Sequence, residues 1–257
     1  MTAILLFFIL HWYLSLFVQT FYLHRYAAHH MFTMSPFWEK AFHVLTFIAQ
    51  GSSYLSPYAY GVLHRLHHAY ADTEQDPHSP KYDPSLFSMM WRPKTTYHQL
   101  FDRSMPVEER FTKGVPQWRA FEVFADAWPT RIAWILGYTA FYVVFAPSAW
   151  WYLLLPLHYV MGPLHGAIIN WYAHKYGYRN YEVSDTSRNM WPVEVLVMGE
   201  GLHNNHHAHS GRANFAAKWW EFDPTWPIIR VLNGLRIIRL RPAAFPVREI
   251  KTRRQAA

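Results

Sequence analysis

Three clusters of histidine constrain this chain more than any other feature. They consist of His24 and His29, of the segment 64–68 and of the segment 203–207, and the last two share the spacing H-x2-H-H. Histidine is the commonest metal-binding side chain, and neutral imidazole suits iron, copper and zinc. Because each cluster lies beside or between apolar segments, the three together indicate a metal-dependent membrane enzyme in which distant parts of the chain converge.

The composition narrows the kind of metal site. The chain has 257 residues, of which 51% are hydrophobic and 17 are histidine, and it contains no cysteine. Disulfides, thiolate-ligated haem and cysteine-ligated iron–sulfur clusters are therefore excluded. The net charge of +7 suggests anionic partners. A cytoplasmic face that obeys the positive-inside rule explains this charge better than nucleic acid does.

Charge-free windows indicate where the chain crosses the membrane. Residues 1–24, 41–64 and 132–174 contain no Asp, Glu, Lys or Arg, and a spanning helix needs about 20 mainly apolar residues. We predict spans at roughly 3–23, 132–146 and 150–172, with a short turn at 146–149. The first is not expected to be a cleaved signal peptide, because it lacks a basic amino-terminal region and runs directly into His24.

The middle window is treated differently because the three clusters must share one face of the bilayer to build one site. An even number of crossings then separates any two clusters, and the window is too short for two passes. We predict that 37–62 lies in the interface or dips in and returns, with interruptions at Gly51 and Pro57. The alternative is a true span, which would place the second cluster on the far side.

The resulting fold class is all-α: a single integral membrane domain over 1–257 with a cytoplasmic helical cap that carries a histidine-rich di-metal site. The cap comprises 63–130 and 175–257. All 24 Lys and Arg fall on the histidine side or at its boundary. This distribution places the active site on the cytoplasmic face of an inner or plasma membrane.

Helical spacing suggests how the ligands divide. Residues four apart share a face of a helix, so His64 with His68, and His203 with His207, each form a chelating pair. The inner histidine of each cluster points elsewhere, which suits two adjacent metals. The first cluster has i, i+5 spacing, and its two rings converge only if the helix ends or unwinds there.

A ninth histidine is predicted as a ligand at the end of the last span. His174 follows Asn170 by one helical turn, and polar residues at membrane depth are functional candidates. The other histidines are expected to make hydrogen bonds inside the helix bundle or to lie in loops beside the ligands. They are His11, His43, His158 and His165 in apolar segments, and His30, His78, His98 and His209 elsewhere.

In these motifs the chain resembles the integral-membrane fatty acyl desaturases of the stearoyl-CoA type. The resemblance covers roughly residues 20–210 and includes the run Gly-Glu-Gly-Leu-His-Asn-Asn-His-His at 199–207. It implies a di-iron centre held by nine histidines and by a water on Asn170. One iron would take His24, His29, His64, His68 and His206, and the other would take His67, His174, His203 and His207. Leu63 stands where the family typically has an acidic residue. The resemblance therefore does not determine which group the acyl chain is attached to.

The resemblance further implies the reaction: oxygen-dependent formation of a cis double bond in a long saturated acyl chain, at Δ9. Acyl-CoA is the expected substrate form, with carrier-protein and lipid linkage left open. Unactivated methylenes have no acidic proton, so an oxidised metal species must start the reaction. The electrons would come from a separate ferredoxin, rubredoxin or cytochrome, which we expect to dock on Arg25, Arg65, Lys175 and Arg179, while the basic tail binds lipid.

Two other functions are compatible with the sequence. A membrane di-iron hydroxylase or monooxygenase would use the same kind of histidine site. A non-catalytic membrane haem or metal-binding protein would need fewer histidines, and these would face each other within spans. No nucleic-acid partner is expected.

Overall fold

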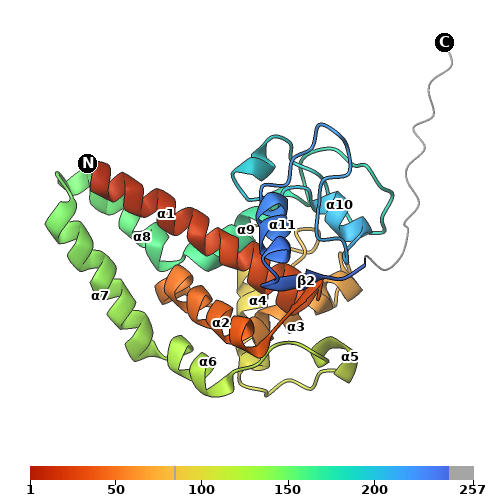
Figure 1. Cartoon of the computed structure of the whole chain (residues 1–257), viewed down its shortest axis with the longest axis horizontal. Coiled ribbons are helices and arrows are strands. Elements are labelled where there is room, and N and C mark those ends of the chain that lie inside the picture. Colours follow the sequence, from red (N-terminus) through yellow and green to blue (C-terminus); the bar gives the residue numbers. More distant parts are fainter. Residues whose placement is uncertain (84, 243–257) are drawn as a thin grey trace, which may run out of the picture.

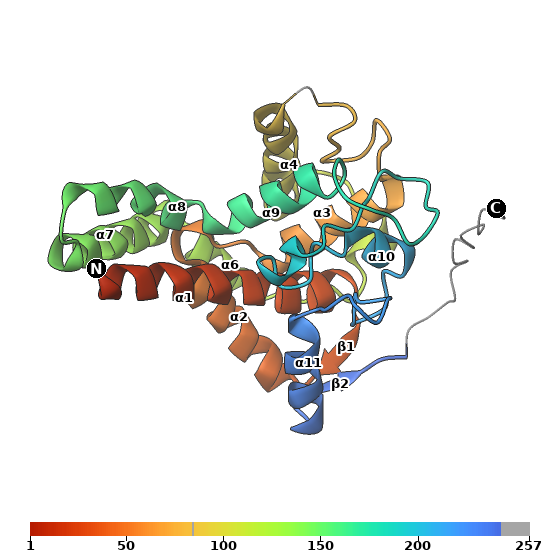
Figure 2. The ribbon, with the colours of Figure 1, turned by 90° about the horizontal axis from the view of Figure 1, so that it is seen from above.

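The computed structural model describes residues 1–83 and 85–242, and in these the chain is mostly helical. Helices α1 (Thr2–Val18), α7 (Trp128–Phe145) and α8 (Leu155–Tyr159) extend together at one end (Figures 1 and 2). The other end holds α3 (Pro57–Tyr70), α10 (His203–Ala208) and α11 (Thr225–Gly234). Two short antiparallel strands, β1 (Phe32–Met34) and β2 (Ile238–Leu240), also lie there. The sequence did not indicate these strands.

The first helix runs further than the predicted span. α1 continues into a π-helical segment, η1 (Gln19–Ala28), and the two form one helix of 27 residues, long and apolar enough to cross a membrane. The N–H of His29 donates to the carbonyl of His24 at 3.2 Å, which is the i→i+5 bond that defines a π-helix. This wide turn is the local unwinding that the spacing of the first cluster required.

The predicted segment 150–172 is a bent helix pair. A 3₁₀ turn, η3 (Ala149–Leu154), leads into α8, and the stretch 149–159 meets α9 (Met161–Tyr172) at 74°. Pro163 explains the bend because it lacks the N–H that would bond the carbonyl of Tyr159. The hydroxyl of Ser52 donates to that carbonyl instead, at 3.2 Å. Among the described residues, this bent pair is the second stretch that could cross a membrane.

The segment 37–62 consists of two helices separated by a tight turn. α2 (Pro36–Gln50) ends at Gly51, whose φ is +52°, and a 3₁₀ turn, η2 (Gly51–Ser53), follows. α3 begins after Ser56, whose hydroxyl accepts the N–H of Ala59 at 3.2 Å, with Pro57 at the first helical position. A side-chain cap followed by proline is a common helix start, so both breaks lie where Gly51 and Pro57 predicted them.

Four further helical elements belong to the cap. They are α4 (Leu86–Phe101), α5 (Glu109–Thr112), α6 (Arg119–Asp126) and η4 (Val193–Val195). α3 packs against η1, α4 and α5. The second histidine cluster on α3 is thereby held against the first cluster on η1.

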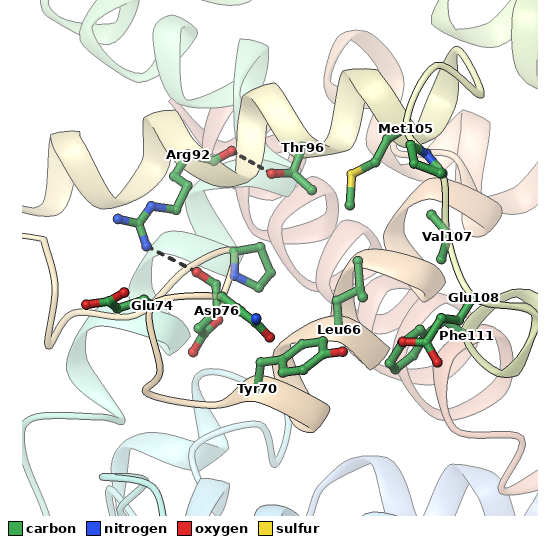
Figure 3. Close-up of a pocket in the computed structure, with 13 residues that line it drawn as sticks. Leu66, Tyr70, Glu74, Asp76, Arg92, Thr96, Met105, Val107, Glu108 and Phe111 are labelled. Atoms are coloured by element: carbon green, nitrogen blue, oxygen red, sulfur yellow. Dashed lines mark hydrogen bonds between the residues drawn. The ribbon is translucent and has the colours of Figure 1, made fainter.

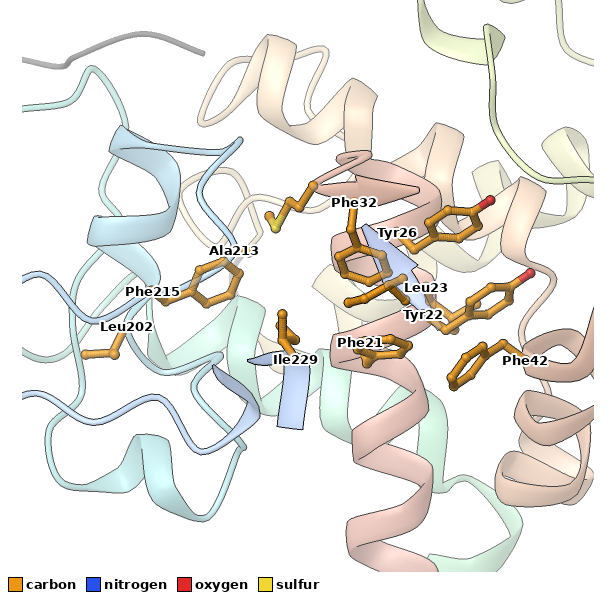
Figure 4. Close-up of a cluster of buried hydrophobic side chains, with 12 residues drawn as sticks. Phe21, Tyr22, Leu23, Tyr26, Phe32, Phe42, Leu202, Ala213, Phe215 and Ile229 are labelled. Carbon is orange, nitrogen blue, oxygen red and sulfur yellow. The ribbon is translucent and has the colours of Figure 1, made fainter. Parts of the chain in front are cut away.

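One hydrophobic cluster fastens the amino-terminal and carboxy-terminal parts of the chain together (Figure 4). Phe21 and Phe32 stack with ring centroids 4.8 Å apart, and Phe215 and Ile229 belong to the same buried cluster. Each such side chain contributes about 1.5–3 kcal/mol when it is fully buried. The packing of these hydrophobic side chains fixes the first and third histidine clusters relative to one another.

His11 and His158 form the hydrogen bonds inside the bundle that the sequence predicted, whereas neither ring nitrogen of His165 has a hydrogen-bond partner among the described residues. The Nδ1 atoms of His11 and His158 are 2.6 Å apart, and Tyr142 Oη lies 2.9 Å from His158 Nε2. Burying these groups costs less because they satisfy one another. This set lies away from the metal clusters and joins α1, α7 and α8.

Candidate metal centre

The structure brings all nine predicted histidines together in two adjacent groups. Within each group the candidate ligand nitrogens lie within 4.8 Å of one another. The first group contains His24, His29, His64, His68 and His206, and the second contains His67, His174, His203 and His207. This division is the one that the resemblance to the desaturases implied, and helical spacing had indicated its part for the second and third clusters.

Helices α3 and α10 each divide their histidines between the two groups. On α3 the outer pair, His64 and His68, joins the first group, and the inner histidine joins the second. On α10 the outer pair, His203 and His207, joins the second group, and the inner one joins the first. Residues four apart share a helix face. Each of the two helices therefore contributes its outer pair to one group and its inner histidine to the other.

Close Nε2 to Nε2 distances show that the rings point inward. They are 2.9 Å between His24 and His206 and 2.9 Å between His29 and His64. In the second group the Nε2 atoms of His174 and His203 are 3.2 Å apart. Two imidazole nitrogens this close either share a proton or face a common metal ion.

Acidic side chains hold the opposite nitrogen of three ligands. The Nδ1–H of His24 donates to Glu200 at 2.8 Å, and those of His67 and His207 donate to Asp76 and Asp185, each at 2.9 Å. A carboxylate on Nδ1 fixes the tautomer and leaves the Nε2 lone pair free for a metal.

A fourth ligand is oriented in the same way by a hydroxyl. His174 Nδ1 lies 3.2 Å from Thr186 Oγ1, and this hydroxyl donates to Asp72 at 2.7 Å. The sequence reasoning missed these orienting residues. Glu200 stood in the quoted run at 199–207, but the sequence offered no comparable signal for Asp72, Asp76 or Asp185.

Burial keeps the histidines in the form that binds metal. Desolvation is the main cause that holds the pKa of six of them well below the ordinary value, namely His29, His64, His68, His203, His206 and His207. Neutral imidazole is the ligand form. The pKa of Asp76 is lowered to about 2: burial raises it, but the hydrogen bond from His67, the charges of His67 and His78 and the backbone N–H of His78 together outweigh that effect.

Unpartnered atoms provide a test of whether a metal fits here. The Nε2 atoms of His67 and His207 are buried and have no hydrogen-bond partner among the described residues. A buried polar atom left unpaired costs about 1–3 kcal/mol. Both atoms belong to the second group, where a metal ion would satisfy them. An all-imidazole donor set suits iron, copper or zinc rather than magnesium or calcium.

Comparisons with known proteins agree with this chemistry. The family model for fatty acid desaturases matches residues 1–236. The chain is 32% identical to the sn-1 stearoyl-lipid 9-desaturase of Anabaena variabilis, over 82% of this chain and 74% of that protein. For the protein of the same name from Synechocystis sp. the identity is 30%, over 84% and 64% of the two chains. An acyl-CoA C20 Δ5-desaturase of Anemone leveillei is 29% identical over 86% and 68%.

This chain belongs to the fatty acid desaturase family. It is an oxidoreductase that acts on fatty acyl chains, as the histidine motifs predicted. The histidine groups are consistent with a metal centre in such an enzyme.

A cavity of about 1000 Å³ leads to the histidine groups of the desaturase. Its wall includes His64 and His203 from the two groups, together with Asn170 on α9. Asn170 belongs to neither histidine group, but it lies on the same cavity wall as His203. The remaining wall is mostly apolar and aromatic and passes between α1, α3, α4, α7 and α9.

Part of the cavity wall, on α4 and at the start of α7, carries exposed aromatic side chains: Phe87, Trp91 and Trp128 are 79%, 58% and 74% exposed. We call this exposed part the cavity mouth. The charged residues on this part of the wall are Lys94, Asp102, Asp126 and Arg131, whose formal charges cancel. An exposed belt of tryptophan beside a cationic group is typical of a membrane interface.

A second cavity, of about 390 Å³, is lined by Asp76 among other residues (Figure 3). Arg92 donates to the carbonyl of Asp76 at 3.2 Å, while the Asp76 carboxylate accepts from His67. Glu74 and Glu108 also line this cavity, and Arg92 is the single cation among its lining residues. Its acidic wall therefore distinguishes it from the acyl-sized cavity.

Two arginines that the sequence offered for donor docking have structural roles instead. Arg25 is fully buried and pairs with Glu200 at 3.2 Å and Asp223 at 2.8 Å. The guanidinium of Arg65 donates to backbone carbonyls, including that of Ala28 at 2.6 Å. The expected docking role of these two side chains is wrong, because neither offers a free guanidinium to a partner. The basic tail beyond 242 lies outside the described residues.

Proposed function

We propose that the desaturase holds two irons, with nine histidine ligands and with Asn170 acting through a water. The first iron would be bound by His24, His29, His64, His68 and His206, and the second by His67, His174, His203 and His207. The observation that carries this assignment is the pairing of fixed Nδ1 atoms with inward-facing Nε2 atoms in two adjacent groups. Such ligation suits a redox metal rather than a purely structural ion.

The proposed reaction balances with external electrons. A saturated –CH2–CH2– unit, one O2, two electrons and two protons give –CH=CH– and two waters. Bound iron supplies the oxidising power needed to remove hydrogens from unactivated carbon. The chain's own residues would place one C–C bond beside the histidine groups, because the cavity wall runs past His64 and His203. Such positioning is itself a large part of catalysis.

The cavity wall would also shield the reacting part of the acyl chain from water. Its apolar and aromatic lining excludes water from the acyl chain, and enclosure of this kind prevents side reactions. The carboxylates of Glu200, Asp76 and Asp185 keep the imidazoles oriented and balance positive charge near the metals. The two electrons would come from a separate protein of the ferredoxin, rubredoxin or cytochrome type.

The substrate is proposed to be a long saturated acyl chain of about 18 carbons attached to a membrane lipid, with the double bond at Δ9. Two of the relatives are named stearoyl-lipid 9-desaturases. The sequence favoured acyl-CoA, but the cavity mouth supports a lipid. Its charges cancel, whereas the phosphates of coenzyme A call for an excess of cations. Its exposed tryptophans suit a mouth that opens within the bilayer interface.

The histidine groups are proposed to lie on the cytoplasmic side of the membrane. The proposal adds α7, on the predicted span 132–146, as a third crossing to the two stretches that are long and apolar enough to cross a membrane, and it keeps the returning segment 37–62. It is supported by the end-to-end separation of the apolar helices from the histidine cap (Figure 2) and by the placement of Lys and Arg. Cysteines introduced at Ser35 and Thr73, exposed positions before and after the segment 37–62, should both react only with a reagent applied from the cytoplasm.

The function is tested by reconstituting the iron-loaded chain in lipid nanodiscs that contain stearoyl phospholipid, with a reductant and O2. We expect an oleoyl product in air, no product under argon and about two irons per chain. A hydroxylated product would favour the monooxygenase alternative. A haem absorption band without turnover would favour the haem protein. Desaturation of stearoyl-CoA in preference to the lipid would overturn the assignment of the carrier.

A further inference from the structure

The first histidine group reaches the protein surface at one edge. His29 and His68 of this group are partly exposed. His207 of the second group is partly exposed as a whole residue, but its side chain is only 1% exposed. The three rings form a continuous row, because the ring centroids of His29 and His68 are 4.6 Å apart and those of His68 and His207 are 4.4 Å apart. We call this row the histidine edge; its exposed members belong to the first group, and the buried ring of His207 connects it to the second.

Three cationic residues flank this edge from separate parts of the chain. Lys113 is exposed and lies in the loop that packs on His30, since a Cβ at Gly114 would lie 3.2 Å from His30 Nε2. Arg241 is exposed at the end of β2, and its N–H donates to the carbonyl of Met31 at 2.9 Å. Both residues are therefore tied to the backbone that immediately follows His29.

The third cation lies at the other end of the row. Arg212 is partly exposed, and its N–H donates to the carbonyl of His209, two residues after His207. Within the described part of the chain, Lys113, Arg212 and Arg241 take part in no ion pair. By contrast, Arg110 on the nearby α5 is paired with Glu108 at 2.8 Å. The charges beside the edge are thus left free to attract an anionic surface.

We infer that the histidine edge is where electrons reach the metals, and that Lys113, Arg212 and Arg241 dock a small acidic one-electron carrier there. The inference rests on the proposed function. Each carrier, an iron–sulfur or haem protein, would be oxidised by one electron. Two encounters would supply the two electrons of each turnover, and the two protons would come from solvent. The contact needs no deep pocket, because weak redox encounters bury little surface.

Other surfaces suit such a carrier less well. The wall of the second cavity contains Glu74, Asp76 and Glu108 against Arg92, and would repel an acidic partner. The mouth of the larger cavity is apolar and is proposed to face lipid. Lys175 is exposed and adjacent to His174, but that histidine is buried, and the lysine lies over the ring of Trp171 at 3.2 Å. Of the surfaces compared within the described residues, the histidine edge combines unpaired cations with access to the ligands.

The test uses the iron-loaded full chain in nanodiscs and an acidic ferredoxin with its reductase. The triple variant Lys113→Glu, Arg212→Glu, Arg241→Glu should raise KM for ferredoxin about tenfold or more and leave kcat at saturating donor nearly unchanged, because steering acts on encounter. Its KM should also lose most of its dependence on ionic strength. Lys175→Glu is the matched control and should leave KM within about twofold.

Two further measurements separate docking from folding and from the chemistry itself. Dithionite replaces ferredoxin as a chemical reductant, and the triple variant should then turn over at the wild-type rate. Direct binding of ferredoxin to the immobilised chain should weaken by the same factor as KM rises. An unchanged KM and binding constant in the triple variant, or an equal rise in Lys175→Glu, would overturn the docking site. Failure of the wild-type chain to turn over with dithionite would count against the proposed function, while the binding measurement would still decide the docking site.

Discussion

The Nδ1 atom of His24 lies 2.7 Å from an oxygen of Glu200, and the same carboxylate meets the guanidinium of Arg25 at 3.2 Å. Arg25 in turn pairs with Asp223 at 2.8 Å and is fully buried. One carboxylate thus orients a predicted metal ligand and balances an interior charge that would be costly alone. This network ties the first histidine cluster to the segment that follows the third.

Replacing this carboxylate should weaken the metal site without removing a ligand. Glu200→Gln keeps the size of the side chain but offers His24 a weaker acceptor and leaves Arg25 undercompensated. We expect iron affinity to fall about 10–100-fold, the usual effect of losing such a partner, together with a lower Tm. Competition with an iron chelator would measure the change. Glu182→Gln, at an exposed position, is the control, and an equal loss there would argue against the role of Glu200.

The division of ligands predicts which metal each substitution releases. His68→Ala removes a member of the first group, and His203→Ala a member of the second. Each variant should retain about one iron or less where the parent holds about two, and should lose desaturation. Metal analysis and the yield of unsaturated product would measure both effects. His98→Ala, exposed and outside both groups, should keep the full iron content; wild-type activity in two of the nine ligand variants would refute the assignment.

The sequence was sufficient to divide the histidines because H-x2-H-H on a helix has a fixed angular consequence. The pairs His64 with His68 and His203 with His207 needed only helical periodicity. The first cluster required more, since residues five apart diverge on an α-helix. The sequence indicated that the helix must end or unwind at this cluster. It did not indicate a π-helix over Gln19–Ala28, because a π-helix has no strong residue signature.

The orienting acids were harder to predict because they depend on tertiary placement. Asp72, Asp76 and Asp185 lie in polar, irregular segments that resemble ordinary surface loops in composition. Only the fold shows that each meets a histidine. The bend at Pro163 was likewise visible as a proline in a charge-free window, but its use of Ser52 to satisfy the Tyr159 carbonyl depends on a residue over a hundred positions away.

The depth of the cavity should set the length of acyl chain that the enzyme prefers. Gly166 lines the cavity, and the nearest atom to a Cβ added there is Gln19 Nε2 at 3.8 Å. Gly166→Leu would therefore add side-chain volume to the acyl space without a backbone clash. We expect preference to move from 18-carbon chains to chains shorter by about two to four carbons, with iron content unchanged. Gly137→Leu, where nothing lies within 4 Å of an added Cβ, is the control, and lipid profiling of both variants gives the answer.

The turn between α2 and α3 depends on a glycine. Gly51 has φ +52°, and a Cβ there would collide with the side-chain hydroxyl of Tyr138 on α7. Gly51→Ala should destabilise the protein by about 1–3 kcal/mol, since it combines left-handed backbone strain with a steric clash. Thermal unfolding in detergent would show this as a lower Tm. Adding Tyr138→Phe should restore part of the loss; no recovery at all would mean that backbone strain alone accounts for the effect.

A buried carboxyl away from the metals should make stability depend on pH. Glu194 in η4 is buried, and neither carboxyl oxygen has a hydrogen-bond partner among the described residues. Burial, with a smaller contribution from Glu221, raises its pKa to about 7. Because the folded pKa lies above the unfolded one, the folded state favours the protonated form. The stability linked to this group is therefore complete below the unfolded pKa and is lost as the pH rises through about 7.

Glu194→Gln keeps the shape of the neutral acid and cannot ionise. The variant should match the parent protein in Tm near pH 5 and exceed it by a few degrees near pH 8. Taking the difference between the two proteins at each pH cancels the titration of the other groups, including the histidines, provided that both samples carry the same iron load. Glu182→Gln at the surface should show no such trend. If the difference in Tm between parent and Glu194→Gln is the same at pH 5 and pH 8, Glu194 is already ionised in the folded protein and a neighbouring cation or water must compensate its charge.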